Sequence, residues 1–283
     1  MLKKYLTLRR IFKEHKINSI HVINEQLMIF FYPLLFRKHT VLDIFDSIFF
    51  TLNKSGNKLR WLKKIIYTPV DKIIVTDENR KNMMPDFIQR KIIVLQNYPN
   101  KFTGSVKKKT EKGKIAILYN GWLGVNRGTD VIEKLLGASP EVYVIMAGWC
   151  IDERTKALCK HDRVKYKGII TQEESLEIAA GQADYILCVY SPINENNINA
   201  SPNKIYDAIQ THTPVIINAE VKISEFVKHE NIGFILNQYN FQNGAEIIAL
   251  LNQMKNMFHF SDELVSLCTW ENIENRLVDV HAI

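Results

Sequence analysis

Long hydrophobic runs are absent from this chain of 283 residues. The longest apolar run, LMIFFYPLLF at residues 27–36, contains a proline and is too short to span a bilayer. The basic start, MLKKYLTLRRIFKEHK, has no long apolar core and no small-residue cleavage site, so we expect no signal peptide. Cysteine is also scarce. The four cysteines show no C-x-x-C spacing, which argues against a zinc site and predicts free thiols in a reducing cytoplasm.

Positive charge predominates. The chain has 37 lysines and arginines against 30 acidic residues, which gives a formal net charge of +7. This excess favours anionic partners, namely phosphates, nucleic acid or acidic lipid headgroups. Because no recognised nucleic-acid-binding module is present, we do not expect nucleic acid to be the partner.

Strand-like and helix-like segments alternate along the whole chain. Short apolar runs rich in β-branched residues, such as DKIIVTD at 71–77, are separated by helical patterns, which predicts parallel sheets covered by helices on both faces. The polar, basic segment at residues 100–114 interrupts the alternation and is predicted to be an interdomain linker. We therefore expect an α/β fold of two Rossmann-like, doubly wound domains, residues 1–105 and 106–283. Ligands should bind at the carboxyl ends of the strands, in the cleft between the halves.

The segment ILYNGWLGVNRGTDVIEKLL, residues 117–136, carries the first candidate site. A strand is expected to end at Asn120, followed by a loop that contains Gly121 and Gly124, and Arg127 opens a helix. Glycines let backbone N–H groups approach an anion, the helix N-terminus attracts it, and an arginine can add a bidentate contact. The spacing matches neither the dinucleotide fingerprint nor a P-loop. A glycine-rich turn with a surface arginine explains this segment equally well.

The segment NINASPNKIYDAIQTHTPVIIN, residues 197–218, carries the second candidate site. Ser201 is predicted as the N-cap of a helix and Pro202 as its first residue. Lys204 then lies in the first turn, where a cation is unfavourable unless an anion is bound. Asp207 lies on the same face, three residues later. The arrangement suits a diphosphate beside Lys204 and ribose hydroxyls beside Asp207, although an internal Lys–Asp pair worth about 0.2–0.5 kcal/mol is the alternative.

The two segments together resemble motifs of the retaining GT-B glycosyltransferases of the group 1 or family 4 type. LYNGWLGVNRG is similar to the family's Y-x-G-R-x…K-G loop, and SPNKIYD is similar to a variant of its later E-x7-E…G-T-P-V-I motif. Residues 17–49, 70–83 and 91–100 resemble segments of the family's first domain. TWENIENRLVDV, residues 269–280, resembles its closing helix, which packs back on that first domain.

This resemblance implies transfer of a sugar from a nucleotide-diphosphate sugar, with retention at the anomeric carbon and with neither a cofactor nor a metal. The chain has no D-x-D triplet, the usual metal–diphosphate motif of the other main fold class. Arg127 and Lys204 fall on the family's phosphate-binding positions and would stabilise the leaving diphosphate. Asp207 falls on the ribose-binding glutamate. The remaining candidates for nucleotide-sugar binding surround these three: Gly121, Gly124, Asn199, Ser201, Pro202 and Asn203.

The chain also departs from the family pattern. Trp122 stands where the family's first diphosphate-binding arginine usually stands, and Asn199 stands where the first glutamate would be. His212 replaces a glycine, and Phe45 replaces the histidine before Asp46. Roughly two or three βα units of the family's first domain have no counterpart at the start of the chain. We therefore expect a shortened N-terminal domain, which a partner chain could complete.

The first half offers weaker candidates for the acceptor side: His21, Asp43 and Asp46. A structural histidine and a turn or cap carboxylate explain these residues at least as well. Two basic, amphipathic segments, residues 2–16 and 57–67, could lie on an anionic membrane surface, as a lipid-linked acceptor would require, or could be solvated helices.

The sequence thus predicts a cytoplasmic glycosyltransferase, with peripheral contact at the inner face of the membrane, that acts on a glycan or lipid-linked acceptor in bacterial surface polysaccharide synthesis. The first alternative is a non-catalytic or split relative that binds a nucleotide or a partner chain. A weaker one is a nucleotide-sugar 2-epimerase.

Overall fold

The structure is a computed structural model that describes residues 2–35, 38–106 and 113–282. The chain divides into two compact units. The first unit comprises residues 1–96, 194–196 and 273–283, and the second comprises residues 97–193 and 197–272. The first boundary in the chain therefore follows residue 96, whereas the sequence places it at residue 105. Part of the expected linker, residues 107–112, lies outside the described residues.

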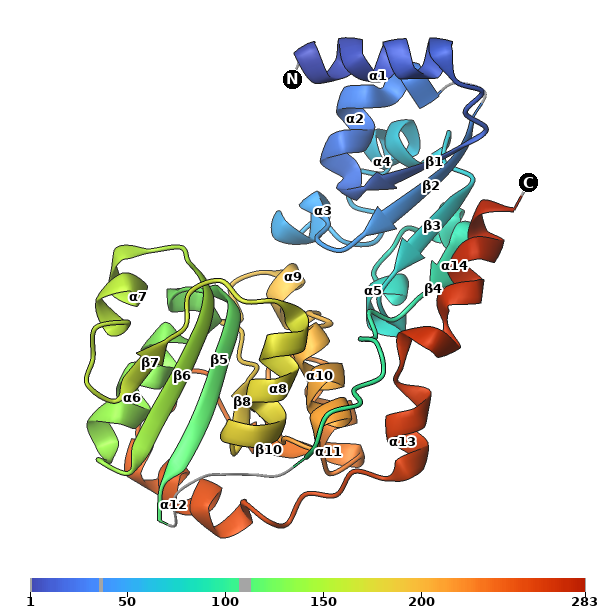
Figure 1. Cartoon of the computed structure of the whole chain (residues 1–283). Helices are drawn as coiled ribbons and strands as arrows, with labels where there is room; N and C mark the ends of the chain where they lie inside the picture. Colours follow the sequence, from blue (N-terminus) through green and yellow to red (C-terminus); the bar gives the residue numbers. More distant parts are fainter. Residues whose placement is uncertain (1, 36–37, 107–112, 283) are drawn as a thin grey trace. The chain divides into compact units, whose positions relative to one another are not determined.

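The first unit contains a four-stranded parallel sheet whose strands follow chain order, β1-β2-β3-β4 (Figure 1). The strands are β1 (Ser19–Ile23), β2 (His39–Ile44), β3 (Lys72–Val75) and β4 (Ile92–Val94). The helices are α1 (Leu2–Glu14), α2 (Asn24–Leu35), α3 (Ile48–Thr51), α4 (Arg60–Tyr67), α5 (Glu78–Asn82), the 3-10 helix η1 (Asp86–Lys91) and α14 (Glu274–His281). None of the described helices of the chain is both long and apolar enough to cross a bilayer.

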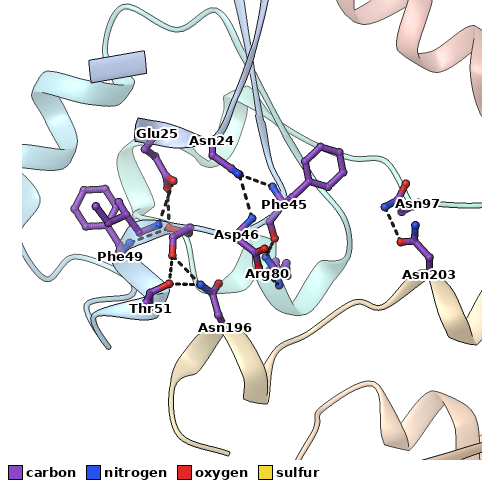
Figure 2. Close-up of polar contacts among 12 residues, drawn as sticks. Asn24, Glu25, Phe45, Asp46, Phe49, Thr51, Arg80, Asn97, Asn196 and Asn203 are labelled. Carbon is purple, nitrogen blue, oxygen red and sulfur yellow. Dashed lines mark hydrogen bonds and ion pairs between the residues drawn. The ribbon is translucent and has the colours of Figure 1, made fainter. Parts of the chain in front are cut away.

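Polar contacts fix the turn that follows β2. The buried carboxylate of Glu25 accepts a hydrogen bond from the Ser47 hydroxyl at 2.7 Å. Asn24 adopts a left-handed backbone conformation, with φ of 59°, and its side-chain oxygen accepts the N–H groups of Phe45 and Asp46 (Figure 2). Because α2 begins at Asn24, these contacts tie the start of that helix to the end of β2.

Two distant segments of the chain complete the first unit. At the start of α9 (Glu195–Ile198), the carboxylate of Glu195 accepts hydrogen bonds from the backbone N–H and the hydroxyl of Ser55. The next residue, Asn196, donates from its side-chain amide to the Ser47 carbonyl (Figure 2). In α14, Arg276 donates to the carbonyl of Val94 at 2.7 Å. The last helix therefore belongs to the same compact unit as the first four strands.

The second unit contains a six-stranded parallel sheet in the order β10-β9-β8-β5-β6-β7 (Figure 1). The strands are β5 (Ile115–Leu123), β6 (Val142–Cys150), β7 (Val164–Tyr166), β8 (Tyr185–Leu187), β9 (Val215–Asn218) and β10 (Gly233–Leu236). The order runs outward in both directions from the pair β5–β8. This is the doubly wound Rossmann arrangement, whose ligands bind at the carboxyl ends of the strands where the order reverses. The expected α/β fold with parallel, Rossmann-like sheets is confirmed.

Helices cover both faces of this second sheet. They are η2 (Val125–Arg127), α6 (Thr129–Ala138), α7 (Glu153–Leu158), α8 (Gln172–Gln182), α10 (Asn203–Thr211), α11 (Ser224–His229), α12 (Gly244–Met254), α13 (Asp262–Leu267) and η3 (Trp270–Asn272). Successive residues of β5 point to opposite faces. Ile117 packs in a core with residues of α6 and α12, and Leu118 packs in a second core with residues of α8 and α10.

The carboxyl ends of β5 and β6 approach each other closely at two glycines. Gly121 and Gly148 are register partners, and a Cβ atom placed on Gly148 would lie 1.9 Å from the carbonyl oxygen of Gly121. Both glycines have positive φ, 91° and 134°, which side chains rarely adopt. Because of this pairing, β5 continues past Asn120 and ends at Leu123, so the expectation that the strand ends at Asn120 is wrong.

We expect Gly148→Ala to destabilise the protein by roughly 3–5 kcal/mol, because the methyl group meets backbone atoms and the φ angle is unfavourable. Gly181→Ala is the matched control: Gly181 lies in α8, and an added Cβ meets nothing within 4 Å. That variant should gain up to about 1 kcal/mol. Urea unfolding of both variants measures the difference, and wild-type stability of Gly148→Ala would contradict the close approach.

Candidate functional site

A cavity of about 460 Å³ opens in the second unit at the carboxyl ends of β5, β6 and β8. It lies at the switch point of the sheet, where ligands of doubly wound folds bind. The structure brings six of the predicted site residues together in its wall: Gly121, Arg127, Pro202, Asn203, Lys204 and Asp207.

Lys204 is the central cation of the cavity. Its ammonium donates a hydrogen bond to the carbonyl of Leu187 at 3.1 Å and lies 5.6 Å from the ring centre of Tyr119. Burial, together with the nearby positive charge of Arg127, lowers the pKa of Lys204 to about 8. The charged form of Lys204 is therefore poorly stabilised by the protein alone.

Asp207 lies one turn further along α10 and is buried, whereas Lys204 is half-buried. Burial raises the pKa of its carboxyl group to about 6. Two contacts act in the opposite direction: the side-chain amide of Gln172, at the start of α8, donates to the carboxylate at 3.2 Å, and the charge of Lys204 is nearby. A ligand hydroxyl that donates to the carboxylate would stabilise the ionised form in the same way.

Arg127 supplies a second cation from the end of η2, after the glycine turn. Its guanidinium lies 4.9 Å from the ring centre of Tyr190, and its side chain is half-buried. Gly128 follows with a φ of 121°, and a Cβ atom there would lie 2.6 Å from the Leu187 side chain. The turn can therefore place Arg127 beside the cavity only because a glycine follows it.

The start of α10 differs from the sequence prediction. Pro202 is the N-cap, with extended backbone angles, and Asn203 is the first helical residue. The Ser201 hydroxyl makes no capping bond; it is buried and has no hydrogen-bond partner. The prediction of Ser201 as N-cap is wrong, because the extended backbone of Pro202 moves the helix start one residue on. The first N–H groups of a helix have no intrahelical partners, so those at the start of α10 remain suited to an anion.

A hydrogen-bond network that the sequence analysis missed holds the loop at residues 121–128. The Tyr119 hydroxyl accepts the N–H of Gly124 at 2.7 Å and contacts Thr129 at 3.2 Å. The Asp152 carboxylate accepts the N–H of Val125 at 2.9 Å and caps α7. The N-cap role of Asp152 could be predicted from the sequence, where Asp-Glu precedes a helix. Its contact with the loop could not, because that contact joins residues 27 positions apart.

Three predicted nucleotide-site residues do not line the cavity: Gly124, Asn199 and Ser201. Gly124 is buried beneath the loop, where a Cβ atom would lie 2.6 Å from the Ile151 side chain, so it supports the turn. Unpredicted polar residues also line the cavity, among them Asn120 and Gln172. The Asn120 amide donates to the Ser175 hydroxyl at 2.8 Å, while its buried side-chain oxygen has no partner.

The acceptor-side candidates lie in the first unit. His21 contacts the Asp43 carboxylate at 3.2 Å and, through its other ring nitrogen, contacts His281 at 3.0 Å. The second oxygen of the Asp43 carboxylate is buried and has no hydrogen-bond partner. Asp46 is exposed and lies 4.0 Å from Arg80. Within the described residues no cluster of three or more His, Cys, Asp or Glu side chains could hold a metal ion.

No protein-family model and no curated protein sequence matches the chain. Several solved structures match its fold. The HepE protein of Anabaena, solved with UDP and glucose, has a TM-score of 0.71 and 15% identity over 97% of this chain and 80% of that one. Sucrose-phosphate synthase from Thermosynechococcus elongatus has a TM-score of 0.74 and 15% identity, over 98% and 76%. The lipopolysaccharide outer core galactosyltransferase WaaB has a TM-score of 0.61 and 12% identity, over 99% and 79%. The chain therefore has the GT-B glycosyltransferase fold.

Proposed function

We propose that the chain transfers a glycosyl group from a nucleotide-diphosphate sugar to an acceptor. The observation that carries the proposal is the convergence of Arg127, Lys204, Asp207 and the start of α10 in one cavity at the switch point. We call this set the donor clamp. Two cations and a helix N-terminus suit a diphosphate, and a carboxylate one turn further suits ribose hydroxyls. HepE, which shares the fold, has been solved with UDP-glucose, which supports this choice of ligand.

In the proposed reaction, the bond between the anomeric carbon and the diphosphate oxygen breaks, and negative charge accumulates on the leaving diphosphate. Lys204 and Arg127 are placed to stabilise that charge. Lys204 is half-buried and its pKa is lowered although Asp207 is nearby, so a diphosphate would add counter-charge that the protein supplies only in part. Fixed positive charges stabilise the negative charge of the leaving diphosphate more than water does. We propose that these two cations take the role that a metal ion has in other glycosyltransferases.

Retention at the anomeric carbon and a role in bacterial surface polysaccharide synthesis are further parts of the proposal. The resemblance of residues 201–207 to the retaining family supports the first. WaaB, a lipopolysaccharide outer core galactosyltransferase of the same fold, supports the second. A glycan or lipid-linked acceptor and a cytoplasmic location complete the proposal.

A nucleotide-binding relative without transferase activity is the second candidate. Two departures from the family pattern favour it: Trp122 supplies no cation at the family's arginine position, and Asn199 replaces a glutamate and does not line the cavity. The donor clamp serves both candidates equally, so binding and transfer have to be measured separately.

We expect Lys204→Ala to lower sugar transfer from UDP-glucose or the true donor by about a hundredfold or more, because one of the two positive charges at the leaving group is lost. Nucleoside diphosphate binding should weaken by about tenfold or more. Radiolabelled transfer and calorimetry with UDP and GDP measure the two effects.

Lys228→Ala, on the exposed surface of α11, is the matched control and should behave as the wild type. Wild-type transfer by Lys204→Ala would refute the donor clamp. If the wild-type protein binds nucleotide but shows neither transfer nor donor hydrolysis, the non-catalytic candidate replaces the enzyme.

We also propose that the first unit contacts an anionic membrane through α4. Trp61 and Ile65, one turn apart on that helix, are 67% and 55% exposed, and Lys64 lies between them. Residues 47–70 contain no aspartate or glutamate. Exposed aromatic and aliphatic side chains among lysines favour the interface of a bilayer with acidic headgroups.

In a sedimentation assay we expect the wild type to bind vesicles of phosphatidylcholine with phosphatidylserine, and to bind less as salt is raised. The double substitution Trp61→Ser and Ile65→Ser should abolish most of this binding. Leu267→Ser, at an exposed position of α13 in the second unit, should leave it unchanged. Equal binding by the double variant and the wild type would exclude α4 as the contact.

A further inference from the structure

Two tryptophans at the mouth of the cavity take no part in the donor clamp. Trp122 and Trp149 both line the cavity and are 64% and 51% exposed. They are register partners on β5 and β6, with ring centres 6.2 Å apart and ring planes inclined by 40°. This spacing lies in the range in which aromatic rings attract each other. Large apolar side chains left in water at the rim of a polar cavity are typical of a ligand surface.

Hydrogen bonds fix the backbone next to the two tryptophans. The Tyr166 hydroxyl donates to the carbonyl of Gly148 at 2.8 Å, and the N–H of Gly148 donates to the carbonyl of Gly168 at 2.7 Å. The N–H of Ile151 donates to the carbonyl of Leu123 at 3.0 Å, which joins the two strand ends. The strand ends that carry the two indoles are therefore held before a ligand arrives, which lowers the entropy lost on binding.

The covalent order of the donor decides which part of it reaches this platform. A nucleotide-diphosphate sugar is joined in the order base, ribose, diphosphate, sugar. With the diphosphate at Lys204 and Arg127 and the ribose at Asp207, the base lies beyond the ribose, on the side away from the phosphates. Asp207 is joined by its hydrogen bond to Gln172, at the start of α8, so this side is the one formed by β6, β7 and the loop that leads into α8.

That end of the cavity has apolar side chains beside the uncharged polar residues Thr171 and Gln172. Its wall includes Trp149, from the end of β6, and Ile169 and Ile170, from the loop after β7. The charged residues that line the cavity are those of the donor clamp, and none of them comes from β6, β7 or the loops that follow these strands. A flat, uncharged ring fits this surface, whereas a phosphate does not.

We propose that Trp149, supported by Trp122, is the platform on which the nucleobase of the donor stacks. The proposal rests on the proposed function, because it takes the donor clamp as the site of diphosphate and ribose. Stacking on an aromatic ring tolerates every base, because each base has a π-face. Trp149 would therefore contribute affinity for the nucleotide as a whole, and the choice among bases would fall to hydrogen bonds at the base edge.

The test compares a ligand that has a base with one that lacks it. In calorimetry with the full chain, Trp149→Ala should weaken UDP binding by roughly ten- to a hundredfold, as expected for the loss of one base–aromatic stack. Binding of inorganic pyrophosphate should change by less than about twofold, because the donor clamp is intact. Trp149→Phe should keep most of the UDP affinity. Trp270→Phe, in η3 and outside the cavity lining, serves as the control and should bind both ligands as the wild type does.

Two results would overturn the platform while the proposed function stands: UDP affinity unchanged in Trp149→Ala, or UDP and pyrophosphate affinity lowered equally. A wild-type protein that binds neither UDP, GDP nor pyrophosphate would overturn the proposed function itself, and the platform with it. Because Trp149 is half-exposed, a melting curve for each variant separates loss of binding from loss of the fold.

Discussion

The site of the second unit depends on one constraint, the partial burial of the Lys204 ammonium. Lys204 is placed at the start of α10, where the helix dipole disfavours a cation, and burial lowers its pKa to about 8. Asp207, one turn on, is buried in the same wall, and its pKa is raised to about 6. Near neutral pH both groups are thus ionised, and keeping them charged costs free energy in the ligand-free protein. A diphosphate and ribose hydroxyls would relieve that cost, which is why the residues are better explained by a ligand than by the stability of the fold.

The sheet places Lys204 and Asp207 where a ligand can reach them. β5 and β8 meet at the switch point, and the two glycines Gly121 and Gly148 let the ends of β5 and β6 approach without side chains between them. Tyr119 and Asp152 then hold the loop that leads to Arg127. The cations therefore come from rigid elements, and little ordering is needed when an anion binds.

The sequence predicted those parts that depend on local pattern. The α/β alternation and the common face of Lys204 and Asp207 follow from spacing along the chain. The start of α10 was misplaced, because the backbone angles of Pro202, not the capping preference of Ser201, decide it. The pairing of Gly121 with Gly148 could not be predicted, because the register between two strands depends on tertiary packing. The aromatic pair on those strands was missed for the same reason.

The titration of Lys204 measures directly whether its ammonium is destabilised in the free protein and stabilised by a bound nucleotide. NMR of the lysine side-chain signals, with Lys204 assigned by its loss in Lys204→Arg, would follow the ammonium as the pH rises. We expect a pKa of about 8 in the free protein and a rise towards the ordinary value of 10.5 when UDP is bound. An ordinary pKa in the free protein that UDP does not change would contradict it.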